Sequence, residues 1–360
     1  MSPLPGKRKA KWPVAVLGAT GAVGQTFVRL LANHPWFELR ELAASERSAG
    51  KKYGEVTRWL EGEMPPSAIG TRRVSACDPG VVTAPIVFSA LDAVVAGEVE
   101  MAFARAGRFV LSNAKNFRME PDVPLVIPEV NGDHLAVIDG QRRNRGWDGA
   151  IVTNANCSAT VAAVALAPLH QRFGIRQLFL STMQAVSGAG YPGVPSLDIL
   201  GNVIPYISDE EPKLEREMLK LLGTYADEEI SNATFKVSAH TNRVPVEHGH
   251  TICMTIGFET KPTPEEAIET MRTWEGLAST KGLPSRPPHP LVVTDAADRP
   301  QPKRDVSAGN GMTVTVGRVR RDAIFDLRMV ALGHNTIRGA AGGSVLNAEL
   351  LASTGAFDSA

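Results

Sequence analysis

The chain has 360 residues, of which 43% are hydrophobic, so it can bury a sizeable core and more readily forms two domains than one. Lys and Arg total 38, as do Asp and Glu, so no net charge draws the protein to nucleic acid or to an anionic membrane. Its three cysteines lie far apart without CxxC spacing, which argues against a disulfide framework and a zinc site. We therefore expect a globular protein that binds a small molecule and no metal.

The first residues, "MSPLPGKRKAKWP", are basic but lack the apolar core of a signal peptide. No later segment has the uninterrupted apolar length of a membrane span. These features predict a soluble, cytoplasmic protein, with a plastid or another organelle as the alternative.

A glycine turn follows the first predicted strand. The segment "PVAVLGATGAVGQTFVRLLANHP", residues 13–35, has an apolar strand, three glycines in a GxxGxxG spacing and an amphipathic helix, which is the opening of a βαβ unit. The glycines permit a tight turn, a close approach of pyrophosphate and close packing of the helix on its strand. This context predicts a dinucleotide site, against the alternative of an ordinary tight turn. The predicted cofactor contacts are Gly18, Thr20, Gly21, Ala22 and Val23.

The segment after the second predicted strand indicates which dinucleotide binds. An NAD site often has an acidic residue here for the ribose 2′-hydroxyl, whereas a 2′-phosphate needs cations and hydroxyl donors. Glu46 complicates the pattern, but hydroxyl and basic side chains outnumber it, and the alternative is a solvated basic loop. We therefore predict NADP, bound by Ser45, Arg47 and Ser48, with Lys51 and Lys52 nearby.

Three further apolar segments, residues 85–92, 108–114 and 123–131, are expected to be strand ends followed by polar loops. Ser89, at the end of the first, is a predicted cofactor contact. The first 150 residues or so are thus predicted to form a doubly wound, mostly parallel Rossmann-type sheet.

Cys157 lies between a short β-branched segment and a long alanine-rich one, in "VTNANCSAT". This pattern places it at a helix N-terminus, where free N–H groups and the helix dipole stabilise a thiolate. We expect a thiol of lowered pKa that acts as a nucleophile; the alternative is a small buried thiol that only packs.

From Gln177 onward the predicted strands are longer and alternate, which is typical of a largely antiparallel sheet with one covered face. Helices are predicted over residues 210–223 and 263–278, the latter with Thr263 as its N-cap. The second half is therefore an α+β unit with a mixed, largely antiparallel sheet. A last helix over residues 339–353 could return to pack on the first domain.

Side chains suited to acyl chemistry accompany the cysteine. Such chemistry needs a proton donor and acceptor, oxyanion donors and a substrate anchor. The segment 240–251 offers Arg243 and three candidate bases, His240, His248 and His250, among which the pattern alone does not choose. Gln184 ends a predicted strand before small residues.

Eight segments, in this order, resemble the aspartate-semialdehyde dehydrogenase family, especially its fungal and archaeal type. They are "GATGAVG", "ASERSAGK", "SNAKNFRM", "PLVIPEVN", "TNANCSAT", "STMQAVSGAG", "RVPVEHGHT" and "HNTIRGAAGG". They span nearly the whole chain and are jointly very specific.

The resemblance implies a role for each matching residue. It implies that Cys157 is the nucleophile, that His250 is the acid/base and that Gln184 orients a thioester. It implies that Arg243 binds the substrate carboxylate, that Arg118 binds phosphate and that Asn335 returns to the nicotinamide. The remaining contacts that we expect are Glu211, Lys213 and Asn116 for the substrate and Ser187 and Gly188 for the cofactor.

The implied reaction is the NADP-dependent interconversion of aspartate semialdehyde plus phosphate and aspartyl phosphate, on the way to lysine, threonine and methionine. We expect an NADP-binding domain over residues 1–156, a catalytic and dimerisation domain over 157–334 and a returning C-terminal helix over 335–360. A homodimer or homotetramer is expected. The alternatives are a malonyl-CoA reductase on the same fold, an N-acetyl-glutamyl-phosphate reductase, whose cysteine motif differs, and a non-enzymatic NADP-binding sensor.

Overall fold

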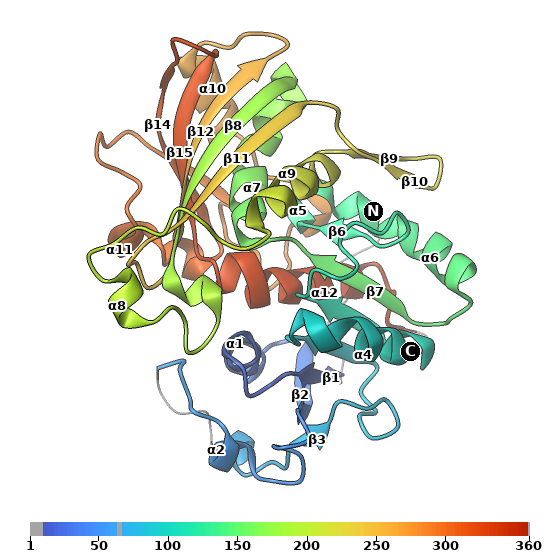
Figure 1. Cartoon of the computed structure of the whole chain (residues 1–360). Coiled ribbons are helices and arrows are strands. Elements are labelled where there is room, and N and C mark those ends of the chain that lie inside the picture. Colours follow the sequence, from blue (N-terminus) through green and yellow to red (C-terminus); the bar gives the residue numbers. More distant parts are fainter. Residues whose placement is uncertain (1–9, 63–66, 359–360) are drawn as a thin grey trace.

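A computed structural model describes residues 10–62 and 67–358 (Figure 1). The predictions made from the first nine residues lie outside the described part. The described chain forms two large sheets, one above the other in Figure 1, with helices between and beside them, and a separate two-stranded hairpin.

The first sheet has seven strands in the order β3-β2-β1-β4-β5-β7-β6, and all of its pairs are parallel. This arrangement confirms the predicted doubly wound sheet. Its strands are β1 (Trp12–Leu17), β2 (Phe37–Ala44), β3 (Ser75–Ala76), β4 (Ile86–Ser89), β5 (Phe109–Ser112), β6 (Leu125–Val126) and β7 (Ala150–Asn154).

Helices cover both faces of this sheet. α1 (Ala22–Leu31) and α12 (Gly342–Ser353) share one apolar core with it, and α4 (Ala93–Arg105) packs in the core on the other face. The shorter helices of this part are α2 (Tyr53–Val56), α3 (Ser67–Gly70), α5 (Pro128–Asn131) and α6 (Ile138–Arg145). Segment 123–131, expected to be a strand end and loop, has only two strand residues, because Pro128 begins α5.

The second sheet has six strands in the order β11-β8-β12-β15-β14-β13. The pairs β11–β8 and β13–β14 are parallel and the other three antiparallel, which confirms the predicted mixed sheet. Its strands are β8 (Ile175–Gln184), β11 (Lys236–Arg243), β12 (His250–Phe258), β13 (Leu291–Thr294), β14 (Val314–Arg321) and β15 (Leu327–Gly333).

One face of this sheet packs against helices in a single apolar core. The helices are α7 (Cys157–Phe173), α9 (Glu210–Leu221) and α10 (Pro264–Arg272). Thr263 caps α10 as predicted, but the helix ends at Arg272, with Thr273 as its C-cap, and not at residue 278. Outside this core lie α8 (Ser196–Ile199), α11 (Pro302–Asp305) and a hairpin of β9 (Thr224–Ala226) and β10 (Glu229–Ser231).

The chain crosses between the two sheets twice. It first crosses between β7 and α7, and it returns after β15 through a π-helical turn, Ile337–Ala341, that leads into α12. In that turn Arg338 makes a fully buried, bidentate ion pair with Glu129 of α5, at 2.8 and 2.9 Å. The last helix thus packs on the first sheet, three residues later than its predicted start.

Among the described residues, no helix is both long enough and apolar enough to cross a membrane. No group of three or more His, Cys, Asp or Glu side chains in residues 10–62 and 67–358 is placed to hold a metal ion.

Candidate active site

Cys157 is the first residue of α7 and lies against a histidine. Its Sγ is 3.1 Å from Nε2 of His250, which begins β12 in the second sheet. Asn156 caps the helix, because its side-chain oxygen accepts hydrogen bonds from the N–H groups of Ser158 and Ala159 at 2.9 and 3.1 Å. The cap and the following alanine-rich helix fix the position of the thiol at the point where the chain passes from the first sheet to the second.

The thiol pKa differs from the sequence-based expectation. Burial raises the pKa of Cys157 to about 12, and the negative charge of Glu210 adds to this effect. Arg118, Arg243 and the N–H of Ser158 act in the opposite direction. The expected lowering was wrong for the ligand-free site, because loss of hydration outweighs the helix N-terminus.

His250 is also uncharged in this environment. Burial lowers its pKa to about 3, with a further contribution from the nearby Arg243. The Ala185 N–H donates to Nδ1 at 3.1 Å, so a neutral imidazole here carries its proton on Nε2 and donates toward Sγ. The acid/base role that the resemblance implies for His250 therefore belongs to a histidine that is neutral in the ligand-free site.

The other two candidate histidines lie elsewhere. His240 is exposed on β11, where its ring packs near Phe179. His248 stacks on His334, with ring centroids 5.0 Å apart, and its Nδ1 lies 3.0 Å from the Ser187 hydroxyl. Of the three, only His250 contacts the cysteine.

Gln184 and Arg243 end neighbouring parallel strands. They are register partners of β8 and β11, so the pairing brings both side chains to one edge of the second sheet. Arg243 is buried and donates from Nη1 to the Ala185 carbonyl at 2.8 Å. A Cβ atom on Gly188 would lie 2.9 Å from Nη1 of Arg243 and 3.1 Å from Cε1 of His250. Only glycine fits between these two side chains.

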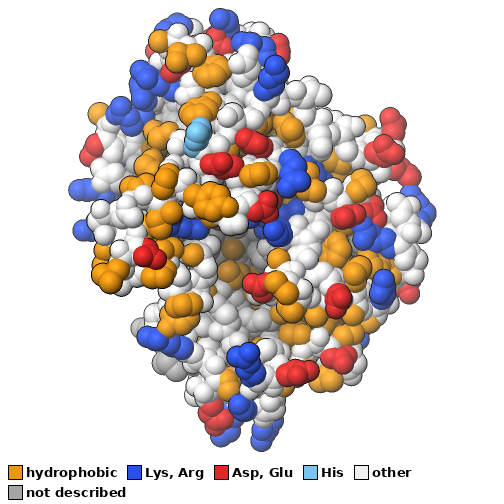
Figure 2. Space-filling view, in the orientation of Figure 1, with side chains coloured by type: hydrophobic (Ala, Val, Ile, Leu, Met, Phe, Trp, Pro, Cys, Tyr) orange, Lys and Arg blue, Asp and Glu red, His pale blue; other side chains and the backbone are white. Residues whose placement is uncertain are grey.

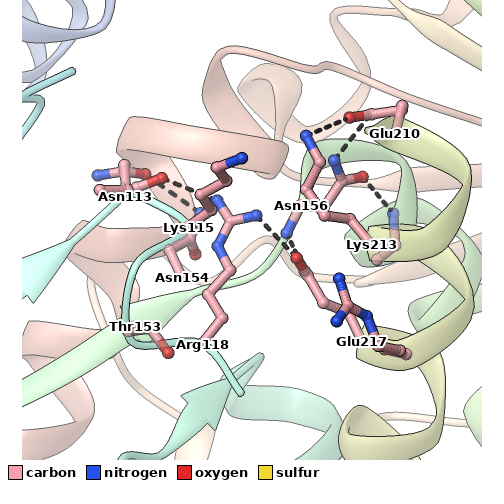
Figure 3. A network of polar contacts seen from close by, with 12 residues as sticks. Asn113, Lys115, Arg118, Thr153, Asn154, Asn156, Glu210, Lys213 and Glu217 are labelled. Atoms are coloured by element: carbon pink, nitrogen blue, oxygen red, sulfur yellow. Dashed lines mark hydrogen bonds and ion pairs between the residues drawn. The ribbon is translucent and has the colours of Figure 1, made fainter. Parts of the chain in front are cut away.

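A buried glutamate of α9 joins this group. Glu210 accepts from the side-chain amides of Asn156 and Gln184 at 2.7 and 3.1 Å, and Nζ of Lys213 lies 3.2 Å from it (Figure 3). Burial alone would raise the pKa of Glu210, but the Asn156 and Gln184 hydrogen bonds and the Lys213 charge lower it. Glu210 is therefore a carboxylate next to the thiol.

The neighbouring Glu211, assigned to the substrate from the sequence, points elsewhere. Its carboxylate accepts from the Thr241 N–H at 2.9 Å and joins α9 to β11. Helical spacing gives the reason, since Glu210, Lys213 and Glu217 recur at intervals of three and four on one face of α9. Sequence reasoning missed Glu210 and Glu217, and this periodicity is the signal that identifies them.

Arg118 reaches the same network from the first sheet. It donates from Nη1 to Glu217 at 2.9 Å and from Nη2 to the Asn113 carbonyl at 2.8 Å, while its buried Nε has no hydrogen-bond partner among the described residues. Asn116 is exposed, and its amide donates to the Ala93 carbonyl at the start of α4. The structure thus brings Arg118, but not the Asn116 amide, into the network of Figure 3.

The glycine turn has the geometry of an anion cradle. Gly18 has a φ of +74°, and a Cβ there would lie 2.6 Å from the Ala90 carbonyl oxygen. Gly21 is the N-cap of α1 and offers no side-chain cap, so the first N–H groups of the helix, near Ala22 and Val23, remain for a ligand. Thr20 lies in the same turn, and Ser89 ends the adjacent β4.

The segment after β2 forms a turn on the surface. The Ser48 N–H donates to the Ser45 carbonyl at 2.9 Å, and Lys51 donates to the Arg47 carbonyl at 2.8 Å. Ser45 and Arg47 are exposed, with Ser48 half-buried. Hydroxyl and basic groups are thereby grouped at the end of the strand next to the glycine turn.

Asn335 connects the returning chain to the loop after β8. It donates to the Ser187 hydroxyl at 2.8 Å and accepts from the Gly249 N–H at 2.9 Å. A cleft of about 660 Å³ lies here, between α1 and the loop, with Ala22, Thr26, Ser187, His248 and His334 among its lining residues. Figure 2 shows the surface hollowed between the two parts of the molecule.

Comparisons with known proteins identify the family. Residues 13–138 match the semialdehyde dehydrogenase NAD binding domain, and residues 166–338 match the semialdehyde dehydrogenase dimerisation domain. The chain is 51% identical to the aspartate-semialdehyde dehydrogenase of Archaeoglobus fulgidus, covering 95% of this chain and 98% of the relative. It belongs to the aspartate-semialdehyde dehydrogenase family.

Other relatives agree with this assignment. The Schizosaccharomyces pombe enzyme of the same name is 47% identical, covering 95% of this chain and 98% of that protein. A crystal structure of aspartate semialdehyde dehydrogenase with NADP from Candida albicans is 44% identical and superposes with a TM-score of 0.87, covering 96% of this chain and 99% of that one. The resemblance and fold class inferred from the sequence are confirmed.

The neutral cysteine–histidine pair leads to a prediction about reactivity. In a Cys77→Ser/Cys253→Ser background, alkylation of Cys157 by iodoacetamide should speed up about tenfold per pH unit from pH 7 to 10, because only the thiolate reacts. The measurement is the rate of mass labelling of the ligand-free protein. A rate that stays constant from pH 7 to 10 would show a stable thiolate–imidazolium pair and contradict the neutral pair.

Proposed function

We propose that this protein catalyses the NADP-dependent interconversion of L-aspartate 4-semialdehyde plus phosphate and L-4-aspartyl phosphate through a thioester on Cys157. The observation that carries the proposal is the 3.1 Å contact between Cys157 Sγ and His250 Nε2 at the start of α7, close to the charged groups Glu210, Arg118 and Arg243. Relatives that share the chain almost end to end bear the name of this activity.

The charges around the thiol match the ends of that substrate. Arg243 is suited to the α-carboxylate, because a planar guanidinium can bind a carboxylate through two parallel hydrogen bonds. Arg118, whose Nε has no hydrogen-bond partner in the described part of the chain, and Lys213 supply cationic groups for phosphate. The ionised Glu210 suits the substrate amine and replaces Glu211, the glutamate that we expected from the sequence to contact the substrate.

The cofactor fits the first sheet. The uncapped N-terminus of α1 suits a pyrophosphate, and the turn carrying Ser45, Arg47 and Ser48 suits a 2′-phosphate. The crystal structure of the Candida albicans relative contains NADP. When bound, NADPH supplies the hydride that reduces the thioester, and we propose that Ser187, Gly188 and Asn335 line the nicotinamide end of its site.

The chain's own groups account for the acyl transfer. In the reductive direction Sγ of Cys157 attacks the acyl carbon, the C–S bond forms, the C–O bond to phosphate breaks, and the thiol proton leaves with the phosphate. Gln184, held by Glu210 and the Thr182 hydroxyl, orients the thioester. As the reduced adduct collapses, the Nε2 proton of His250 hydrogen-bonds to the developing negative charge, and the thiol regains a proton from solvent.

This activity would place the protein in the biosynthesis of lysine, threonine and methionine. The match to a dimerisation domain supports a homo-oligomer. The domain boundaries and the cytoplasmic location expected from the sequence stay predictions. Malonyl-CoA has no amine to pair with Glu210, so the site favours the aspartyl substrate.

The direct test is NADP reduction by the purified protein with aspartate semialdehyde, with and without phosphate. We expect phosphate-dependent turnover that Cys157→Ser abolishes while NADP binding persists, since a serine lacks the nucleophilicity of the thiolate. The matched control is Cys253→Ser, which should keep full activity. Equal or greater efficiency with malonyl-CoA plus NADPH would overturn the proposed substrate and leave the fold and nucleophile unaffected.

The two adjacent glutamates give a sharper comparison. Glu210→Gln should lower kcat/KM for aspartate semialdehyde roughly tenfold to a thousandfold, because it removes one partner of a buried charged interaction. Glu211→Gln, which loses only a contact to the backbone of β11, should change kcat/KM less than about threefold. Steady-state kinetics and a melting curve of each variant check this, and the reverse order would restore the role to Glu211.

A further inference from the structure

Lys220 is a buried lysine with an unusual set of partners. Its side chain lies in α9, only 3% of the residue is exposed, and the ammonium donates to three backbone carbonyls. The acceptors are the carbonyls of Arg118, Glu120 and Val123, at 2.9, 2.7 and 2.8 Å. All three N–H groups of the ammonium are thus used on one segment, residues 118–123.

That segment belongs to the other half of the molecule. It connects β5 and β6 of the first sheet, whereas α9 packs in the core of the second sheet. One turn before Lys220, Glu217 accepts from Arg118 at 2.9 Å and from the Asn156 N–H at 2.6 Å (Figure 3). One face of α9 therefore holds both the segment that carries Arg118 and the residue before Cys157.

We propose that Lys220 is a positioning residue that fixes the Arg118 segment across the junction between the two sheets, and so sets the affinity for phosphate. Lys220 contacts the backbone carbonyl of Arg118 and not the guanidinium that is assigned to phosphate, so it acts on phosphate only through the position of Arg118. The inference rests on the proposed function, in which Arg118 binds phosphate.

The contact depends on the charge of the amine. A neutral amine has two N–H groups, so deprotonation leaves one of the three carbonyls facing a lone pair. Burial lowers the pKa of Lys220 to about 8. The negative charges of Asp122 and Glu120 on the segment and of Glu217 on α9 act in the opposite direction and raise it. The cation Arg118 and the imidazole of His134, whose own pKa is lowered by burial, also face this site.

Two variants and a control test the role at pH 7. Lys220→Met should raise the KM for phosphate about tenfold to a hundredfold, since a displacement of about 1 Å at a binding group has effects of this size. The KM for NADP should stay within twofold. Lys220→Arg, which keeps a charged donor, should recover most of the loss, and Lys236→Met, the same change at an exposed position of β11, should have no effect.

The wild-type pH profile gives a test that does not depend on any substitution being tolerated. The KM for phosphate should rise above pH 8, and this rise should be absent in Lys220→Arg, whose guanidinium stays protonated. A phosphate KM within twofold of wild type in folded Lys220→Met would overturn the inference. If that variant does not fold, a wild-type phosphate KM that stays constant to pH 9.5 would overturn it.

These outcomes are separable from those of the proposed function. A wild-type protein without phosphate-dependent NADP reduction would refute the proposed function itself. An active wild type with an unaffected Lys220→Met would refute only the positioning role.

Discussion

The site depends on a single constraint, the crossing of the chain from β7 of the first sheet into α7 of the second. Because α7 is almost wholly buried, its first residue cannot move without disturbing the core of the second sheet. The returning chain closes on the same point, since a Cβ atom on Gly339 would lie 2.6 Å from the Cβ of Cys157. Three separate segments therefore fix the thiol: the capped helix start, the His250 strand and the glycine turn that leads into α12.

Burial at this crossing determines the electrostatics. It leaves Cys157 and His250 uncharged in the ligand-free site, while hydrogen bonds and Lys213 keep Glu210 ionised. Cys157 is therefore a thiol, and not a thiolate, before the substrate binds. In the proposed reaction the negative charge on sulfur appears during attack and collapse. Arg243 and the Nε2 proton of His250 are already in place at that moment, so little reorganisation is needed.

Local patterns predicted much of the fold and part of the site. The glycine turn, the cysteine at a helix start and the alternating strands can be recognised in short segments of the sequence, so the sequence predicts both sheets. It does not predict that Pro128 begins α5 within segment 123–131, or that α10 ends at Arg272. The pKa values of Cys157 and His250 could not be predicted, because they depend on burial by distant segments. The sequence alone does not show which of Glu210 and Glu211 faces the site. Successive residues of a helix point about 100° apart, so the answer depends on how α9 is rotated about its axis in the folded protein.

The central claim is that Cys157 carries the acyl group between phosphate and hydride transfer. Its most direct test is mass spectrometry of the protein after incubation with aspartate semialdehyde and NADP in the absence of phosphate. We expect a mass increase of one aspartyl group on the peptide that contains Cys157, and this increase should disappear when phosphate is added. An unmodified Cys157 in a preparation that turns over with phosphate, or an adduct that phosphate does not remove, would contradict it.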